Sequence, residues 1–408
     1  MNLKQMTLAA ALGLAATSAL AAPTINVTAA QQRYPWNNIV DVTYTLTGCG
    51  NDSSTYAVVL TTTIGGAEVE LSNGAEPSVD GTHTVACALP SDLQAKNCKI
   101  TGKVYAMANC TPDTGTDGVA EYMIVNLATK KTTFEKKLSY QTLSNKRYNT
   151  TDYKTKYIVF RLVPKGTYKI GDDVNYASAN PRRDCNVNNA YYLTMYPVTS
   201  AQYANVMGNV TTYTDTSATN NLSISTFRGG NTLDANGTSL LSNSQKPTDA
   251  SFVGKVKAMI TDSHTNNWFD MPNDNMWEVA ARAGATTVYY WGDNWNNEFG
   301  SAISGDLYPG YAKAHPVGMR RPNAWGFYDM SGNVFTYVMG KTAGSTSATS
   351  NQPTDALNIF SSGSYWTMRG GSWNINAPSA RLSCRSNYTN GIGGAYASSG
   401  FRLARIVQ

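Results

Sequence analysis

Six cysteines are the side chains best suited to covalent or metal chemistry in this sequence: Cys49, Cys87, Cys98, Cys110, Cys185 and Cys384. No two of them have CxxC spacing, so a zinc site is not predicted. Their even number permits three disulfides in an oxidising compartment, each adding about 2–4 kcal/mol of stability. The sequence leaves the connectivity open; the candidate pairs are Cys98 with Cys110 around a short loop, Cys49 with Cys87 between two strands, and Cys185 with Cys384 between the ends of a second domain.

Motifs for nucleophilic or acid–base catalysis are scarce. The three histidines are far apart in the sequence and do not predict a shared imidazole site: His83, His264 and His315. The residues around Ser372 do not match the G-x-S-x-G turn that exposes a catalytic serine. Asp172-Asp173 is the only adjacent acidic pair in residues 157–408, and we interpret it as a solvated turn. These patterns predict no catalytic residue.

A polar segment near the end of the chain has the composition of a recognition surface. Residues 374–399 are rich in Asn, Ser, Gly, Ala and Tyr and show no helical or alternating period. Tyrosine supplies contact area at a low entropic cost, and small polar residues supply hydrogen bonds. A solvated loop without function is the alternative. The candidate ligand-binding residues are Trp373, Asn374, Asn376, Ser379, Ser383, Arg385, Asn387, Tyr388, Asn390 and Tyr396.

Length and composition favour two β-rich domains. A chain of 408 residues exceeds what one core usually supports. Charged residues are only 14% of the chain, whereas aromatic residues reach 11%. The net charge of +5 is spread thinly, so nucleic-acid binding is not predicted.

The first 21 residues have the pattern of a signal peptide. Lys4 is followed by an apolar stretch, and Ala19-Leu20-Ala21 resembles a cleavage site for export. No later apolar run is long enough to predict a transmembrane helix. We therefore expect export to the periplasm, the cell surface or the medium.

Residues 22–140 are predicted to form a β-sandwich of the immunoglobulin or fibronectin type. About seven short strands, several with alternating hydrophobic residues such as Val40–Leu46, are separated by turns. Residues 141–156 are polar and without period, which indicates a linker. Residues 157–408 begin with two strands, and capping signals predict helices after Thr199, after Asp249 or Ser251, and over 274–283.

Several motifs of the second domain occur in the order typical of a known family. They are Val163–Gly166, Tyr192–Thr199, Met271–Arg282, Pro316–Gly318, Asn323–Val334, Arg369–Trp373 and Gly400–Ala404. Together they resemble the sulfatase-modifying-factor family, whose founding members are formylglycine-generating enzymes. The resemblance implies a C-type-lectin-like α+β fold.

The resemblance also implies where the chemistry of the family would be located. Family members that make formylglycine use a copper-binding cysteine pair, and the matching positions here hold Ala377 and Leu382. Cys384 is displaced from both positions. An acidic residue of a family calcium site is replaced by Thr336, although Asp329 and Asn333 could still bind an ion. We therefore expect no catalytic cysteine pair and no resident cofactor. Calcium is the one ion that these residues could still bind.

Two functions follow from these patterns. The first is an exported protein that binds an unknown protein or glycan ligand through residues 374–399. That segment is similar to the variable regions of proteins diversified by bacterial retroelements, in which Asn, Ser, Tyr, Gly and Ala are scattered between fixed anchors. The second is an oxidoreductase of the sulfatase-modifying-factor family.

Overall fold

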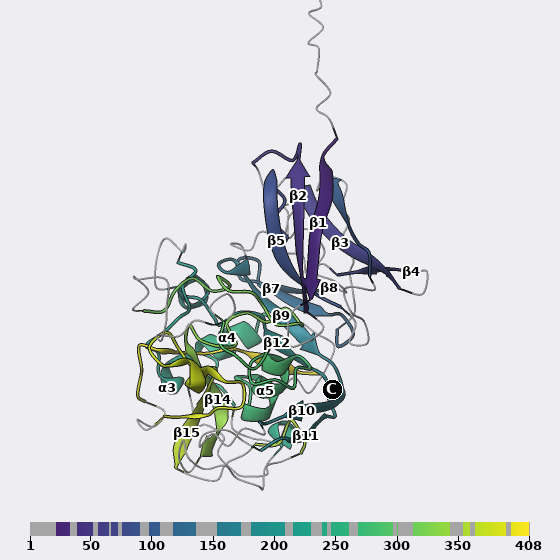
Figure 1. Cartoon of the computed structure of the whole chain (residues 1–408). Helices are drawn as coiled ribbons and strands as arrows, with labels where there is room; N and C mark the ends of the chain where they lie inside the picture. The colour runs from purple at the N-terminus through teal and green to yellow at the C-terminus, as the bar shows by residue number, and fades with distance from the viewer. Residues whose placement is uncertain are drawn as a thin grey trace, which may run out of the picture.

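The computed structural model describes residues 22–32, 39–51, 56–64, 67–71, 76–89, 98–106, 117–135, 153–172, 181–208, 215–229, 239–242, 246–260, 268–296, 300, 313–342, 354–359, 364–388 and 393–407. An N-terminal group of strands lies at one end of a larger body that contains the labelled helices (Figure 1). No helix in the described part of the chain is long and apolar enough to cross a membrane.

Two three-stranded antiparallel sheets form the N-terminal body, with the orders β1–β2–β5 and β4–β3–β6. The strands are β1 (Thr24–Gln32), β2 (Ile39–Thr47), β3 (Tyr56–Ile64), β4 (Ala67–Glu70), β5 (Gly81–Ala88) and β6 (Ile100–Ala106). Alternation along β2 buries Val40, Val42, Tyr44 and Leu46, as predicted. These side chains pack in a core to which both sheets contribute.

Cys49 and Cys87 do not pair as predicted. The register of β2 and β5 runs from Val40 opposite Cys87 to Leu46 opposite Gly81. Cys49 follows the far end of β2, so it lies at least about 20 Å from Cys87 at 3.3 Å per strand residue. A disulfide cannot span that separation. No disulfide joins the described cysteines, and Cys110 lies outside the described residues.

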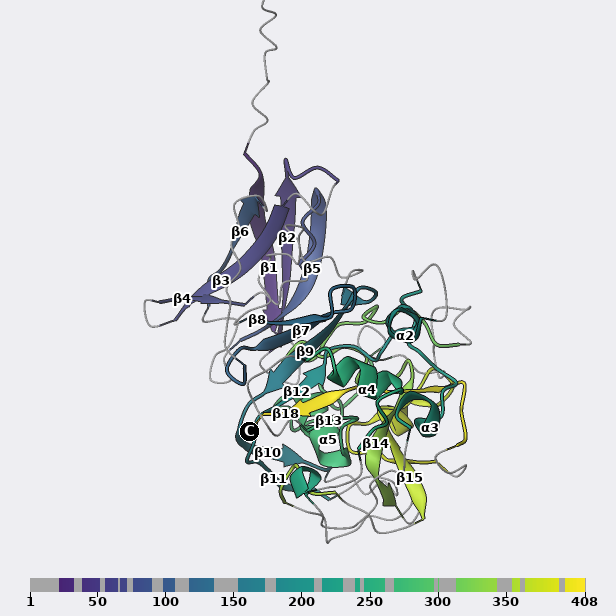
Figure 2. The ribbon, with the colours of Figure 1, turned by 180° about the vertical axis from the view of Figure 1, so that it is seen from behind.

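A six-stranded sheet with the order β13–β18–β12–β9–β7–β8 lies at the centre of the larger body. Its strands are β7 (Tyr122–Asn126), β8 (Lys131–Glu135), β9 (Tyr157–Val163), β12 (Tyr191–Thr194), β13 (Phe269–Asp270) and β18 (Ala404–Ile406). The end of the chain thus lies between β12 and β13, as Figure 2 shows from behind.

The predicted end of the first domain at residue 140 is wrong. β7 and β8 belong to the large sheet, because β7 pairs with β9 from Tyr122 opposite Arg161 to Asn126 opposite Tyr157. Both faces of β7 are buried: Ile124 packs in one hydrophobic cluster and Met123 in another. A hairpin that precedes the predicted linker therefore completes the second domain.

The remaining strands flank a small number of short helices. They are β10 (Gly166–Ile170), β11 (Arg183–Val187), β14 (Phe335–Thr342), β15 (Tyr365–Arg369), β16 (Ser386–Tyr388) and β17 (Ser399–Gly400). The helices are α2 (Ser200–Met207), α3 (Ile224–Phe227), α4 (Phe252–Lys257) and α5 (Asp274–Arg282), with 3₁₀ turns η4 (Leu240–Ser242) and η5 (Ala377–Ala380).

Local capping signals predicted three of these helices correctly. Thr199 and Gln202 form a capping box at the start of α2. The side chains of Ser251 and Asn273 accept backbone hydrogen bonds at the starts of α4 and α5. Each cap satisfies a backbone N–H that the first helical turn leaves without an intrahelical partner.

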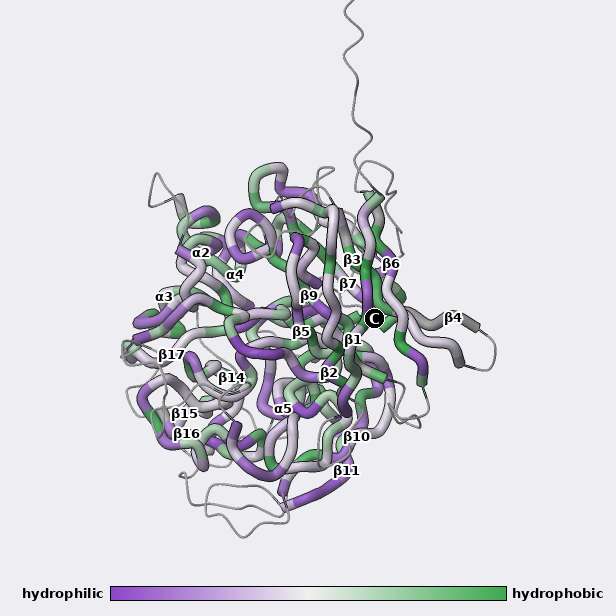
Figure 3. The backbone as a smooth tube through the Cα atoms, turned by 45° about the horizontal axis from the view of Figure 1, so that its top comes forward, coloured by the Kyte–Doolittle hydropathy of each residue, from purple (hydrophilic) through white to green (hydrophobic). Residues whose placement is uncertain are grey.

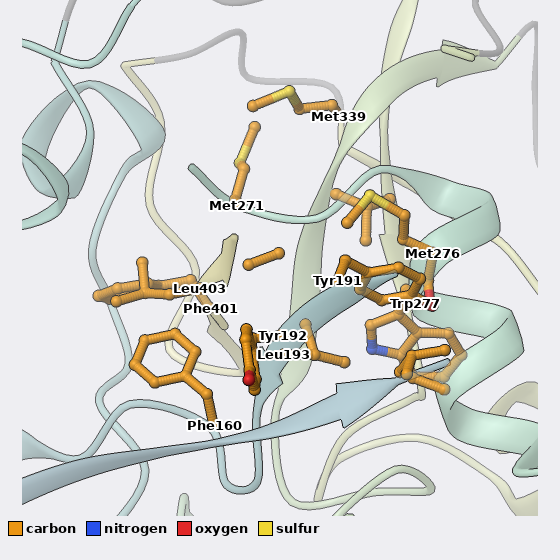
Figure 4. Close-up of a cluster of buried hydrophobic side chains, with 14 of the residues drawn as sticks. Phe160, Tyr191, Tyr192, Leu193, Met271, Met276, Trp277, Met339, Phe401 and Leu403 are labelled. Atoms are coloured by element: carbon orange, nitrogen blue, oxygen red, sulfur yellow. The ribbon is translucent and has the colours of Figure 1, made fainter. Parts of the chain in front are cut away.

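The main hydrophobic core surrounds α5 and the centre of the large sheet. Trp277 and Met276 of α5 lie beside Tyr191, and Phe401 lies near Phe160 (Figure 4). Along the chain, hydrophobic and hydrophilic stretches alternate over short distances, as Figure 3 shows. This pattern agrees with a β-rich fold in which most elements have one buried face.

Candidate functional site

Two buried carboxylates of α5 form ion pairs that attach the polar segment, residues 374–399, to the protein core. Asp274 Oδ1 lies 2.7 Å from Arg369 Nε at the end of β15. Asp274 Oδ2 accepts a hydrogen bond from Arg385 Nε at 2.7 Å, and Arg385 Nη2 also contacts this oxygen. One turn along α5, Glu278 pairs with Arg369 and with Arg282, whose Nε lies 2.9 Å from Glu278 Oε1. We call these five side chains the anchor network.

The anchor network is buried and remains ionised at neutral pH. Each of its side chains is at most 5% exposed. Burial alone would raise the pKa of Asp274, but the guanidinium groups of Arg369 and Arg385 outweigh it and lower the pKa to about 2. The pKa of Glu278 is lowered in the same way, against burial, by Arg369 and Arg282. Ion pairs of this kind replace the hydration that both charges lose.

Two predicted ligand-binding residues belong to this scaffold instead. Arg385 is 5% exposed and its guanidinium is bound to Asp274. Ser383 is fully buried and donates a hydrogen bond to Asp172 Oδ2 at 3.3 Å. Neither side chain can therefore meet a ligand at the surface. Asp172, predicted to be a solvated turn residue, is itself only 6% exposed.

Other predicted residues do lie at the surface. Asn374 and Asn376 are exposed, whereas Trp373, Ser379 and Tyr396 are partly exposed. Asn387 is also partly exposed on β16, the edge strand of the four-stranded sheet. The side chain of Tyr388 and the whole of Asn390 lie outside the described residues. The structure thus separates the segment into a buried base and an exposed polar face.

Close packing fixes the course of the segment at both ends of η5. Gly371 has a φ of +73°, and a Cβ placed there would lie 2.8 Å from Ala380 Cβ. Tyr289 Oη donates a hydrogen bond to Ala377 O at 3.0 Å, and Leu382 N donates to Val288 O at 3.2 Å. The exposed residues between these contacts are therefore carried on a constrained backbone.

Sequence reasoning missed the anchor network and the contact with Tyr289. A signal for the network exists in α5, because Asp274, Glu278 and Arg282 are charged residues spaced four positions apart along one helix. Their arginine partners cannot be read from spacing, since Arg369 is 91 positions from Glu278 in the sequence. The role of the aromatic residues around Tyr289 has no local signal beyond their composition.

The described residues around η5 do not fit a copper centre. Ala377 and Leu382 are buried and have no side-chain atom that binds a metal. The Cys384 thiol donates to Pro378 O at 3.4 Å and is 3% exposed. No group of three or more His, Cys, Asp or Glu side chains suitable for a metal occurs in the described part of the chain.

The potential calcium ligands make protein contacts. Asp329 Oδ2 accepts a hydrogen bond from Gly318 N at 2.7 Å. Asn333 Oδ1 accepts a hydrogen bond from His315 N, and Asn333 Nδ2 donates one to His315 O, each at 3.2 Å. Thr336, which stands where the family has an acidic residue, lies buried in β14 opposite Arg369. This donor set is poor in charge compared with usual calcium sites.

A family model for the Sulfatase-modifying factor enzyme 1-like domain matches residues 148–407. The chain belongs to this family. A curated member, the formylglycine-generating enzyme of Mycobacterium tuberculosis, is 35% identical over 79 residues. That match covers 17% of the present chain and only 26% of the enzyme.

Two solved structures of similar shape were also found. Treponema denticola variable protein 1 has a TM-score of 0.44 at 20% sequence identity. PvdO from Pseudomonas aeruginosa has a TM-score of 0.46 at 17% identity. Each match covers 61% of the present chain and 95% of the solved chain.

Proposed function

We propose that this member of the sulfatase-modifying factor family is an exported ligand-binding protein. Its recognition surface consists of the exposed residues of the 374–399 segment, carried on a C-type-lectin-like scaffold. The observation that carries the proposal is the division of this segment into buried anchors and exposed amides. Arg385 is bound to Asp274 beneath the surface, whereas Asn374 and Asn376 face solvent.

This division suits a surface whose side chains can change without loss of the fold. Substitutions at exposed positions usually alter stability by less than about 0.5 kcal/mol, whereas buried charged networks tolerate little change. Together with the Asn-, Ser- and Tyr-rich composition, it supports diversification of the segment by a bacterial retroelement. A near-duplicate template repeat beside the gene, mismatched mainly at adenines, would establish that origin.

The proposal includes export and a supporting role for the N-terminal sheets. Residues 1–21 would be removed as a signal peptide, and the two small sheets would act as an immunoglobulin- or fibronectin-like spacer. Arg321 pairs with Asp41 of β2, which links this body to the larger one. Cell fractionation and mass spectrometry of the mature N-terminus test export. Intact cytoplasmic protein that retains Met1 would contradict it.

A pair of display libraries tests the binding surface. The first library randomises Asn374, Asn376, Ser379 and Tyr396, and the matched library randomises Ser383, Arg385, Asp274 and Arg369. Both are selected against the same panel of immobilised proteins and oligosaccharides. We expect folded, specific binders from the first library and mainly unfolded variants from the second. Equal yields of folded protein, or no binder from the first library, would refute the proposal.

The match to a formylglycine-generating enzyme keeps an oxidoreductase as the alternative function. On the alignment given by the family motifs, however, Ala377 and Leu382 occupy the positions of the copper-binding cysteines. One thiol, Cys384, cannot supply the two thiolate ligands that such a soft metal prefers. Metal analysis of the purified protein and a formylglycine assay on a sulfatase peptide separate the two functions. Stoichiometric copper with turnover would favour the enzyme.

A further inference from the structure

A compact aromatic loop lies beside the exposed polar face. We use this name for residues 288–296, which contain Tyr289, Trp291 and Trp295. The rings of Tyr289 and Trp291 are stacked with centroids 4.8 Å apart and an interplanar angle of 6°. Trp295 packs edge-on against both rings, at 5.4 Å from Tyr289 and 5.6 Å from Trp291. These contacts hold the Trp295 ring in one orientation.

The aromatic loop is joined directly to the recognition segment. Tyr289, which contacts the Trp295 ring, donates a hydrogen bond from its hydroxyl to Ala377 O, and Asn376 is the residue just before Ala377. Trp291 and Tyr289 are buried, but Trp295 remains partly exposed. The Tyr289 ring therefore links the partly exposed Trp295 to the backbone next to Asn376.

The two exposed amides are oriented before any ligand binds. Ser372 Oγ donates a hydrogen bond to Asn374 Oδ1 at 2.6 Å. Ser379 Oγ donates to Asn376 Oδ1 at 2.7 Å. With each carbonyl oxygen held by a neighbouring hydroxyl, the amide nitrogen keeps its two N–H donors for a ligand. Such preorganisation reduces the entropic cost of binding.

Charge and hydrophobicity then narrow the class of ligand. The only charged residues in 374–399 are Arg381 and Arg385, and Arg385 is neutralised by Asp274. The aromatic loop adds one acidic residue, Asp293, so the two segments together contain two arginines and one aspartate. The large hydrophobic side chains that are exposed in the described residues lie elsewhere: Val119, Met319 and Tyr365. A strongly ionic ligand finds few counter-charges here, and the large side chains that are exposed in the described part of this segment, Asn374 and Asn376, are neutral hydrogen-bonding groups rather than apolar ones.

We infer that the surface formed by Trp295, Asn374 and Asn376 binds a neutral carbohydrate. The inference rests on the proposed binding function and names its ligand class. Sugar hydroxyl and ring oxygens would accept hydrogen bonds from the two amide nitrogens. The C–H face of a sugar ring would pack on the indole of Trp295, so that no charge is required on either side.

The test uses the mature full-length chain on an array of neutral, sialylated and sulfated oligosaccharides. We expect binding confined to neutral glycans, followed by titration of the best one with isothermal calorimetry. Trp295→Ala should weaken that binding by at least about tenfold, and Asn374→Ala with Asn376→Ala should weaken it similarly. Trp295→Phe keeps an aromatic ring and should retain most of the affinity.

Trp325→Ala is the matched control. Trp325 is another partly exposed tryptophan, and its ring packs edge-on against Tyr168 of β10 at 5.4 Å. Its removal should leave glycan affinity unchanged, and near-ultraviolet circular dichroism should show that each variant is folded. Preference for acidic glycans, or unchanged affinity in folded Trp295→Ala, would overturn the inference. If the display library yields only protein binders and no glycan binds, the inference fails while the proposed binding function stands.

Discussion

Arg385 and Asp274 are 111 positions apart in the sequence, yet the guanidinium of one binds the carboxylate of the other in the protein interior. This contact joins the base of the recognition segment to the first turn of α5. Arg369 binds the second oxygen of the same carboxylate. The segment is thus attached to the core through a charge pair, although its outer face is built from small neutral side chains.

Breaking this pair should destabilise the protein strongly. Arg385→Met leaves Asp274 buried with one partner fewer, and removal of one member of a buried pair usually costs about 3–5 kcal/mol. Lys169→Met is the control, because Lys169 and Asp184 form a pair in which both side chains are 54% exposed. The control should lose less than about 1 kcal/mol. Urea unfolding measures both, and equal losses would show that the buried pair is unimportant.

Stability should fall when the medium becomes acidic enough to protonate the anchor network. The pKa of Asp274 in the folded protein is about 2, below its ordinary value of 3.8. The ionised group therefore stabilises the fold above pH 4, and this contribution is lost as the pH falls towards 2. Glu278 acts in the same direction, whereas Asp270, whose pKa is raised by burial despite Arg228, acts in the opposite one.

Asp274→Asn isolates this effect. The variant should be less stable than the natural protein at pH 7, and its urea midpoint should change less between pH 4 and pH 2. Parallel curves for the two proteins over that interval would contradict a role for the ionised carboxylate.

Glycine should be required at position 371 and dispensable at position 393. Gly371 has a φ of +73°, and a methyl group there would meet Ala380 and Ile375 at 2.8 Å. Gly371→Ala should therefore cost about 1–3 kcal/mol through backbone strain alone. Gly393 has no atom within 4 Å of the equivalent position, so Gly393→Ala should leave the thermal midpoint almost unchanged. Similar midpoints for the two variants would refute the constraint at η5.

Cys185 should behave as a protected thiol. Burial raises its pKa to about 12, and its side chain has no exposed surface. Iodoacetamide at pH 8 should leave Cys185 unmodified in the folded protein and alkylate it in urea without any reductant. Peptide mass spectrometry reads the result, with the partly exposed Cys98 as an internal comparison. A requirement for reductant before labelling in urea would establish the disulfide with Cys384 expected from the sequence.

Local sequence patterns predicted where helices and strands begin and end better than they predicted which strands pair with one another. The capping residues Thr199 and Asn273 act within three residues of the helices that they start, so a linear pattern contains their whole signal. The partner of β7 is chosen by long-range packing on both of its faces, and no alternation of residues encodes that choice. Its placement in the first domain was wrong for this reason.

The recognition segment illustrates the same limit. Composition indicated a polar surface, and Asn374 and Asn376 do lie in solvent. Ser383 and Arg385 have the same polar character but are buried, because Asp172 and Asp274 lie beneath them. Depth below the surface depends on residues more than a hundred positions away. A list of polar residues cannot distinguish the two groups.

The hairpin formed by β7 and β8 has a consequence for how this protein could be divided. The family match begins at residue 148, but the sheet that supports it continues into strands that end at Glu135. A fragment that starts at Tyr157 would expose the backbone edge of β9, and unpaired edges invite association between copies. The region that matches the family therefore cannot be separated from the preceding residues without removing two strands of its sheet. Recombination at residue 148 that replaced everything before it would also replace β7 and β8. The six-stranded sheet of the larger body would then lose the backbone hydrogen bonds between β7 and β9.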